Sequence, residues 1–283
     1  MKTISAIALG FAFAAATPLT AQEAGDSDTA REAYEGSVFD GDWLSIGAGA
    51  VYSPSYKGSD DHVVSPLPII QGSLGGVGIN PRPGGVALDF IPDADGKVAL
   101  AAGVAAKLNR NRATQIEDPV VESYGELDTA FEVGPSAGVS FPGLLNPYDS
   151  LSFNLDALWD VAGAHDGMTV TPTVTYFTPV SRSAAISLSL GATHVDDDYA
   201  AYYYSVPAGG ALPAFQAQGG FESAGVNLLG AIDLDGDLAN GGLALIVLGG
   251  YSRMLGDAKR SPFTSIRGDA DQWMGALGIG YTF

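Results

Sequence analysis

From residue 42 onward, apolar and polar side chains alternate in segments of about ten residues separated by polar links. Successive side chains of a β-strand point to opposite faces, so this alternation predicts strands rather than helices. In 43–52, for example, Leu44, Ile46 and Tyr52 share one face and glycines occupy the other. The pattern predicts twelve strands, at 43–52, 64–72, 77–80, 85–91, 98–109, 130–141, 151–161, 169–176, 186–193, 222–233, 242–254 and 273–283.

Two features leave this layout open. The pattern is weak in 77–91, so ten strands remain an alternative if that region is a bulged excursion. Pro135 and Pro172 fall inside predicted strands, and a proline removes one donor from a strand ladder. We expect bulges or shortened pairing at both positions.

The links between strands alternate in length. The longer ones are 53–62, 110–127, 162–167, 195–219 and 255–271, and short turns lie between them. Outer-membrane barrels have an even number of antiparallel strands, short periplasmic turns and long outer loops. The sequence therefore predicts an all-β fold, a transmembrane antiparallel up-and-down β-barrel with both termini in the periplasm. Closure of the barrel would leave no free sheet edge.

The chain ends in a strand whose alternate residues are large and apolar. Such a strand resembles the closing strand and terminal-Phe assembly signal of bacterial outer-membrane β-barrels. We expect one face of this strand to contact lipid and to serve in membrane assembly. The residues of that face are Trp273, Leu277, Ile279, Tyr281 and Phe283.

The beginning of the chain predicts export. Lys2 precedes an uncharged apolar stretch at 4–16, and small residues follow at 19–21, which is the pattern of a cleaved secretory signal peptide. Residues 22–41 are polar and acidic without periodicity. We therefore predict a signal peptide at 1–21, a flexible periplasmic lead-in at 22–41 and a barrel at 42–283, in the outer membrane of a Gram-negative bacterium.

Composition narrows the chemistry. The chain has no cysteine, which excludes disulfides and thiolate metal sites, and its formal net charge of −19 disfavours nucleic acid as a partner. The acidic run 233–237 is similar to the start of a calcium loop but has Ala244 where such a loop needs a glutamate. We expect no cofactor and no bound metal.

The strand alternation also places a set of polar side chains toward the lumen. Charges that face lipid cost free energy, so an inward orientation is the physical default. We expect a hydrogen-bonded network that supports the barrel from inside. The candidate residues are Lys107, Glu132, Asn154, Asp156, Asp160 and Asn227.

The link 195–219 is the best candidate for an exposed functional loop because of its length. Aromatic residues at this level usually belong to the interfacial girdle, and the alternative is a loop that binds a sugar or a protein partner. The candidate contacts in this link are Asp196, Asp197, Asp198, Tyr199, Tyr202, Tyr203 and Tyr204.

The sequence does not display an enzyme site. No Gly-x-Ser-x-Gly nucleophile elbow occurs, and the remaining arrangement for a hydrolase would combine His194 with Asp196 or Asp198 and a loop serine. We expect a protein that is not an enzyme.

Several segments together resemble the MipA/OmpV family of outer-membrane proteins. They are the Gly-Ala-Gly-Ala-Val-Tyr-Ser-Pro-Ser-Tyr-Lys-Gly-Ser segment at 47–59, Pro-Leu-Pro at 66–68, the Leu-Gly-Asp-Ala and Ser-Pro segment within 251–262, and the terminal Gly-Ile-Gly-Tyr-Thr-Phe. The resemblance implies an outer-membrane barrel in contact with lipid, lipopolysaccharide and the barrel assembly machinery. Members are proposed to scaffold a murein lytic transglycosylase and a penicillin-binding protein. We therefore expect a scaffold for peptidoglycan-remodelling enzymes. The alternative is a narrow, cation-favouring channel for small solutes.

Overall fold

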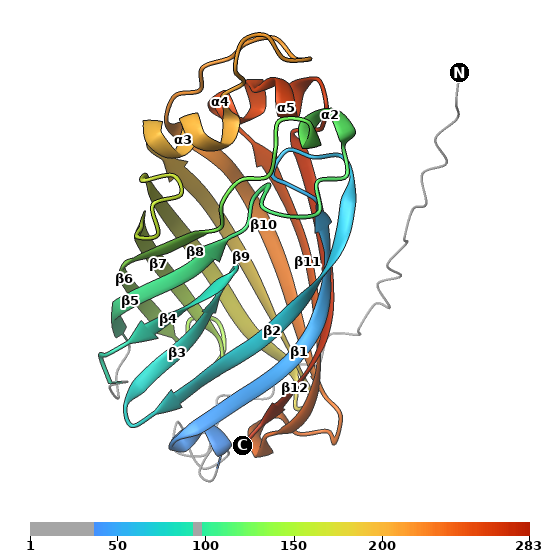
Figure 1. Cartoon of the computed structure of the whole chain (residues 1–283). Coiled ribbons are helices and arrows are strands. Elements are labelled where there is room, and N and C mark those ends of the chain that lie inside the picture. The colour runs from blue at the N-terminus through green and yellow to red at the C-terminus, as the bar shows by residue number, and fades with distance from the viewer. Residues whose placement is uncertain (1–36, 93–97) are drawn as a thin grey trace. The chain divides into compact units, whose positions relative to one another are not determined.

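The computed structural model describes residues 37–92 and 98–283, and within them twelve strands form a closed barrel (Figure 1). Every strand pairs antiparallel with its neighbours in sequence, and β1 pairs with β12. The twelve-strand prediction is confirmed and the ten-strand alternative is wrong. The strands are β1 (Trp43–Pro54), β2 (His62–Leu74), β3 (Val77–Arg82), β4 (Gly85–Asp89), β5 (Ala99–Asn109), β6 (Ala130–Pro142), β7 (Ser150–Asp160), β8 (Met168–Ser181), β9 (Ala184–Val195), β10 (Gly220–Asp233), β11 (Gly242–Met254) and β12 (Asp271–Thr282).

The predicted signal peptide at 1–21 and most of the lead-in at 22–41 lie outside the described residues. The last part of the lead-in forms the short 3-10 helix η1 (Val38–Asp40). Its N-cap Ser37 accepts from the Phe39 backbone N–H, and the Asp40 carboxylate accepts from the Ser37 backbone N–H. This reciprocal capping holds the chain in place just before β1 begins.

The strand that closes the barrel has the two faces that its alternation predicts. On β12, Trp273, Leu277, Ile279, Tyr281 and Phe283 are exposed on the outer surface, and the residues between them line the inside. The small lining permits close approach of β1, where a Cβ added at Gly49 would lie 2.3 Å from the Leu277 carbonyl oxygen. Glycine at this position therefore lets the first and last strands pair.

Of the bulges or shortened pairing that we expected at the two prolines inside strands, the structure shows the shortened pairing and no bulge. Neither Pro135 in β6 nor Pro172 in β8 causes a register shift, but the β6–β7 pairing skips 134–135 and the β8–β9 pairing skips 171–172. The register shifts lie elsewhere, between Phe221 and Ser223 in β10 and between Pro179 and Ser181 in β8. Each proline lacks the N–H for a ladder bond to one neighbouring strand, so the pairing on that side is interrupted locally and the register is unchanged.

The two ends of the barrel differ. The long connections gather at one end, where they carry the helices α2 (Pro119–Glu122), α3 (Asp197–Tyr204), α4 (Gly256–Arg260) and α5 (Pro262–Ser265) (Figure 1). We call these connections the cap. At the other end the strands are joined mostly by short turns, one of which carries the 3-10 helix η2 (Leu238–Asn240). No helix among the described residues is long and apolar enough to cross a membrane.

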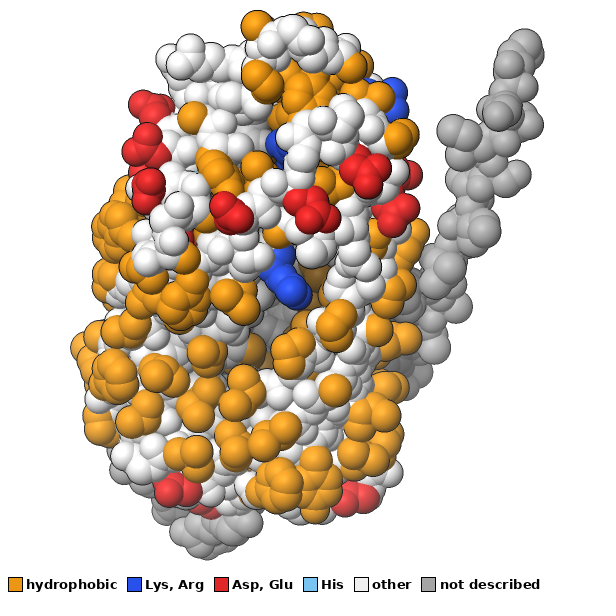
Figure 2. Space-filling view, viewed as in Figure 1, with side chains coloured by type: hydrophobic (Ala, Val, Ile, Leu, Met, Phe, Trp, Pro, Cys, Tyr) orange, Lys and Arg blue, Asp and Glu red, His pale blue; other side chains and the backbone are white. Residues whose placement is uncertain are grey.

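The outer surface has the distribution of side chains that a bilayer requires. Figure 2 shows hydrophobic side chains over the strands, with acidic side chains gathered in a band near the cap and at the opposite end. Large apolar residues are exposed on strand after strand around the wall, including Leu100, Leu155, Leu190 and Leu228. Lipid rather than protein is the natural contact for this surface.

Candidate functional site

The cap contains many of the fully buried side chains among the described residues, and α3 supplies the three tyrosines Tyr199, Tyr203 and Tyr204. Asp196 is the N-cap of this helix because its Oδ1 accepts from the Tyr199 backbone N–H at 3.0 Å. Asp197 and Asp198 follow in the first turn, where negative charge is favourable to the helix dipole. Residues 197–204 are therefore helical. The length of the link 195–219 and its acidic start had suggested an exposed loop instead.

The helix turns its tyrosines inward, which corrects our expectation for them. Tyr199, Tyr203 and Tyr204 are fully buried, and Tyr202 is partly buried with its hydroxyl accepting from the Asp128 backbone N–H at 2.9 Å. A helix brings side chains three and four positions apart to one face, so a stretch read as an exposed loop becomes a buried aromatic wedge. These tyrosines lie neither in the lipid girdle nor on the outer surface.

The acidic residues that precede them have local partners. Besides capping α3, Asp196 accepts from the Met168 backbone N–H at 2.8 Å, and Asp197 accepts from the Gly219 backbone N–H at 2.7 Å. Of the three acids, Asp197 and Asp198 are exposed to solvent. A role for them in surface contacts stays a prediction.

Glu222 at the start of β10 is the first anchor of the cap. Its carboxylate accepts from the Tyr204 hydroxyl at 2.5 Å and from the Tyr199 hydroxyl at 2.9 Å, and forms an ion pair with Lys57 Nζ at 2.8 Å. Burial and the neighbouring carboxylate of Glu222 raise the pKa of Tyr204 well above its ordinary value, so this hydroxyl remains a donor. The carboxylate is completely buried but has charged and hydroxyl partners, as a buried charge requires.

Glu132 in β6 is the second anchor. Its carboxylate pairs with Lys107 Nζ at 2.9 Å and accepts from Asn109 Nδ2 at 2.8 Å and from Thr169 Oγ1 at 3.1 Å. Asn109 Nδ2 also lies 3.3 Å from the Tyr199 hydroxyl, so the two anchors join through one tyrosine. Wall strands and cap helix therefore share one buried polar cluster.

His165 packs beside this cluster. Its Nδ1 accepts from the Gly167 backbone N–H at 3.0 Å, which places the ring proton on Nε2. Nε2 faces Glu132 at 3.5 Å, too far for a strong hydrogen bond, and the ring contacts Tyr199 edge-on at 4.9 Å between centroids. The histidine fills space against the tyrosines.

The other residues predicted for the lumen are distributed along the inner face. Asp156 forms an ion pair with Arg82 at 2.7 Å and accepts from Ser136 at 2.6 Å. Asp160 instead accepts from backbone N–H groups of the turn that follows it, including that of His165 at 2.8 Å. Asn154 and Asn227 also lie on inward positions, and within the described chain their side chains have no hydrogen-bond partner. The structure therefore forms two separate clusters and not one network through all six.

The remaining cap interior is packed around Arg112. Its buried guanidinium lies 4.1 Å from the ring centre of Phe263 and donates to the Tyr203 carbonyl oxygen at 3.3 Å. Burial, with the charge of Asp118, raises the pKa of the neighbouring Tyr56 to about 12. The cap thus forms a small core over the end of the lumen.

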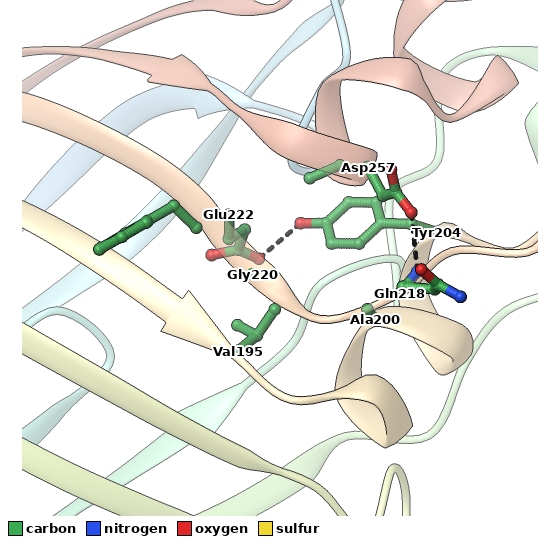
Figure 3. Close-up of a pocket in the computed structure, with 9 residues that line it drawn as sticks. Val195, Ala200, Tyr204, Gln218, Gly220, Glu222 and Asp257 are labelled. Carbon is green, nitrogen blue, oxygen red and sulfur yellow. Dashed lines mark hydrogen bonds between the residues drawn. The ribbon is translucent and has the colours of Figure 1, made fainter.

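Figure 3 shows how closely the cap fits the wall. Tyr204 points to Glu222, and the Gln218 backbone N–H donates to Asp257 at 2.9 Å. The cavity among these residues measures about 10 Å³, room for one water molecule at most. The cap therefore fills this part of the barrel end.

The geometry does not assemble the hydrolase set considered from the sequence. His194 is on the outer face of β9, where its ring packs edge-on against Phe221 at 5.4 Å between centroids. Asp196 is engaged in capping α3. The two side chains therefore serve separate local contacts.

Sequence reasoning missed Glu222, Lys57, Asn109 and Arg82 as site residues. Glu222 stands at the register shift that separates Phe221 from Ser223, and a bulge re-aims a side chain in a way that alternation cannot predict. The aspartate N-cap before a run with tyrosines four residues apart is the signal that could have revealed α3.

A comparison with protein families gives a match over residues 46–283 to the family described as MltA-interacting protein MipA. The match covers almost the whole barrel. The chain belongs to the MipA family. The resemblance inferred from the sequence is confirmed, and the protein is an outer-membrane β-barrel.

The solved structures that resemble this chain have low sequence identity to it and TM-scores below 0.5. An outer-membrane channel from Pseudomonas putida F1 has 13% sequence identity and a TM-score of 0.46, with 86% of this chain and 96% of that chain covered. The toluene transporter TbuX of Ralstonia pickettii has 11% identity and a TM-score of 0.35, with 86% and 89% covered. The comparison with curated proteins gives no match.

Proposed function

We propose that this MipA-family barrel is a docking platform that holds a lytic transglycosylase at the inner surface of the outer membrane. The family description supplies the partner class, because it names interaction with MltA. The proposal places the contact on the periplasmic rim, which we define as the turns 143–149, 182–183 and 234–241. The observation that carries it is that hydrogen-bonded turns of this rim expose apolar side chains.

One turn of the rim is ordered by a single carboxylate. Asp149 accepts from the backbone N–H groups of Leu144 and Leu145 at 2.7 and 2.9 Å and from the Tyr176 hydroxyl at 2.7 Å. Leu145 is nevertheless 78% exposed. An apolar side chain fixed on a rigid turn loses little entropy on binding, which is the character of a hot spot.

The neighbouring turns are tied together. Arg182 forms an ion pair with Asp237 at 2.6 Å, and its carbonyl oxygen accepts from the Leu238 backbone N–H at 2.8 Å. Asp233 organises the second turn by accepting from three successive backbone N–H groups. Leu234 is exposed there, so the rim presents apolar groups from two turns.

The test is binding of a purified MltA-type transglycosylase to the full-length barrel in lipid nanodiscs. Substitution Leu145→Asp is expected to weaken binding at least tenfold, the loss of about 1.4 kcal/mol or more that a hot spot gives. The matched control is Ile266→Asp, because Ile266 is a similarly exposed apolar residue at the capped end. If both variants bound the transglycosylase as tightly as the unchanged protein does, docking through Leu145 on the rim would be excluded.

A second candidate, a channel for small solutes, is favoured by one observation. Asn80 and Asn227 point inward and yet are exposed, so part of the lumen holds water. Glu132 and Asp156 each have a basic partner, which weakens the basis for the expected cation preference. Planar-bilayer recordings that show conductance without any transglycosylase binding would favour this candidate.

A further inference from the structure

The barrel wall has a weak place between β2 and β3. Their ladder consists of the pairs Gly72 with Ile79, Ser73 with Gly78 and Leu74 with Val77 and ends there. On its other side β2 pairs with β1 over its whole length, from Ser73 to His62. Among the described residues, the part of β2 that precedes Gly72 therefore has no strand paired to this edge. We define the β2–β3 seam as the edge of β2 at 64–71 and the facing edge of β3 at 80–82.

The register shows which backbone groups face the seam. Leu44 and Phe283 exchange both backbone hydrogen bonds, and the Ser55 N–H donates to the Asp61 carbonyl. In an antiparallel ladder, bonded residues alternate between the two neighbours of a strand. The backbone N–H and C=O groups of the even-numbered residues of β1 thus point to β12, and those of the odd-numbered residues point to β2. Odd-numbered residues of β1 lie opposite odd-numbered residues of β2, so the backbone groups of the even-numbered residues of β2 point to the seam.

Prolines occupy the seam positions on both strands. Pro66 and Pro68 are even-numbered residues of β2, and Pro81 is the next residue of β3 that would face β2 after Ile79. If the ladder continued, Ile70 would meet Pro81, and Pro68 would meet Pro83. Because proline has no backbone N–H, these rungs lose donors. The sequence thus prevents the seam from closing into regular sheet and also protects its edges from pairing with another chain.

A cavity of about 350 Å³ lies at the upper end of the seam (Figure 2). Arg110 and Lys57 line it, and no acidic side chain does, in a protein with 32 acidic and 13 basic residues. The Lys57 ammonium already pairs with Glu222, so Arg110 is the cation left for a ligand. Arg110 is exposed, and its guanidinium has no hydrogen-bond or ion-pair partner among the described residues. Serine, threonine, asparagine and glutamine side chains complete the polar lining. The cavity is suited to an anionic group.

The wall below the cavity is apolar on both faces. Val64 and Ile70 are exposed on the outer face of β2, where lipid contacts the barrel. Leu67 and Ile69 take the alternate positions toward the lumen, and Ile69 packs against Gly278 of β12. A ligand with an apolar chain would find matching surface along the seam and a basic cavity at its end.

We propose that the β2–β3 seam binds a single-chain anionic amphiphile such as a long-chain carboxylate. The chain lies against Pro66, Pro68 and Leu67, and the head group lies in the cavity at the guanidinium of Arg110. The seam opens toward the bilayer, so the ligand enters from the membrane. This site is independent of the periplasmic rim and of transglycosylase docking.

Photolabelling of the full-length protein in phosphatidylcholine nanodiscs tests the site. A diazirine analogue of a long-chain carboxylate is expected to label mainly residues 63–70 and 109–115, and excess laurate should suppress the labelling. Arg110→Gln should lower it about tenfold, because a hydrogen bond to a charged group is lost. Arg253→Gln is the control, since Arg253 pairs with Asp271 outside the cavity.

Three outcomes would overturn the proposal. They are labelling spread evenly around the barrel, equal loss in both arginine variants, and equal labelling by a zwitterionic single-chain analogue or by a two-chain anionic lipid analogue. The first two outcomes would contradict binding at the seam, and the third would contradict a single-chain anionic amphiphile as the ligand.

A crosslink across the cavity mouth gives a second, independent readout. The side-chain oxygens of Ser65 and Gln115 lie 3.3 Å apart across the cavity mouth, and the natural chain has no cysteine. A short thiol crosslinker in the S65C/Q115C variant is expected to abolish labelling. The same crosslink in S140C/S152C, on the regular β6–β7 ladder, should leave labelling intact. Undiminished labelling of the crosslinked first variant would contradict binding of the head group in the cavity.

Discussion

The Tyr199 hydroxyl donates to Glu222 Oε1 at 2.9 Å, so the cap helix is fastened to the barrel wall through a buried carboxylate. The same hydroxyl accepts from Lys57 Nζ at 3.0 Å. Cap, wall and the β1–β2 loop therefore meet at one tyrosine. Cap stability should depend on this meeting point far more than on the exposed residues of α3.

Removal of the Glu222 carboxylate is expected to release the cap. Glu222→Ala leaves Lys57 without its partner and two tyrosine hydroxyls without an acceptor, a cost on the order of 3 kcal/mol that the partial exposure of Lys57 moderates. Limited proteolysis should cut 196–219 at least tenfold faster while the barrel stays folded by gel mobility. Asp198→Asn, on the exposed face of α3, is the control; it removes only a favourable charge in the first turn and should raise the rate less than about fivefold.

The cap is expected to loosen in acid through Asp118. Burial of this carboxylate opposes ionisation, but hydrogen bonds from Arg267 and from the Val121 N–H hold the pKa of Asp118 below its ordinary value. Its contribution is therefore complete above the ordinary aspartate pKa of about 3.9 and is lost as pH falls through the lowered value. Hydrogen exchange of the α2 amides should show this loss. In Asp118→Asn the exchange should already be fast at neutral pH, and an unchanged acid profile in that variant would contradict the assignment.

The junction of the first and last strands should tolerate no side chain at Gly49. A Cβ there would lie 2.7 Å from the Gly278 Cα, so Gly49→Ala must shift backbone and should cost about 1–3 kcal/mol. Gly249→Ala is the matched control because nothing lies within 4 Å of its added Cβ. Urea unfolding in lipid vesicles measures both. Equal stability of the two variants would show that β1 and β12 pair less closely than the structure indicates.

The terminal aromatic residue is expected to serve assembly. Phe283 exchanges backbone hydrogen bonds with Leu44 and is 65% exposed, so its ring contributes little packing within the barrel. Phe283→Ala should lower the fraction of folded barrel in the outer membrane several-fold and leave the stability of the purified barrel nearly unchanged. Phe221→Ala, another exposed outer aromatic, is the control. A similar loss in both variants would assign the effect to lipid contact alone.

The barrel was predictable from the sequence because lipid imposes a strict pattern on each strand. Outward residues such as Leu155 and Leu277 must be apolar, and alternation then reveals strand positions and register parity. The pattern also placed Lys107 and Glu132 on inward positions, where the structure pairs them. The same alternation gives the number of strands, and the alternating lengths of the links show that the long loops lie at one end of the barrel.

The cap and the seam were not predictable because they depend on local exceptions to that regularity. A helix of eight residues turns Tyr203 and Tyr204 inward, and the register shift beside Glu222 adds the carboxylate that binds them. Pro66 and Pro68 are visible in the sequence, but only the pairing of β1 with β12 shows that their missing donors face an open edge.

The most direct test of the central claim is crosslinking from the periplasmic rim. A photoreactive amino acid at Leu145, expressed in cells with a tagged MltA-type transglycosylase, should yield a covalent complex identified by mass spectrometry. The same amino acid at Ile266 should yield none, because that residue lies at the capped end. A complex formed equally from both positions, or from neither, would contradict docking at the rim.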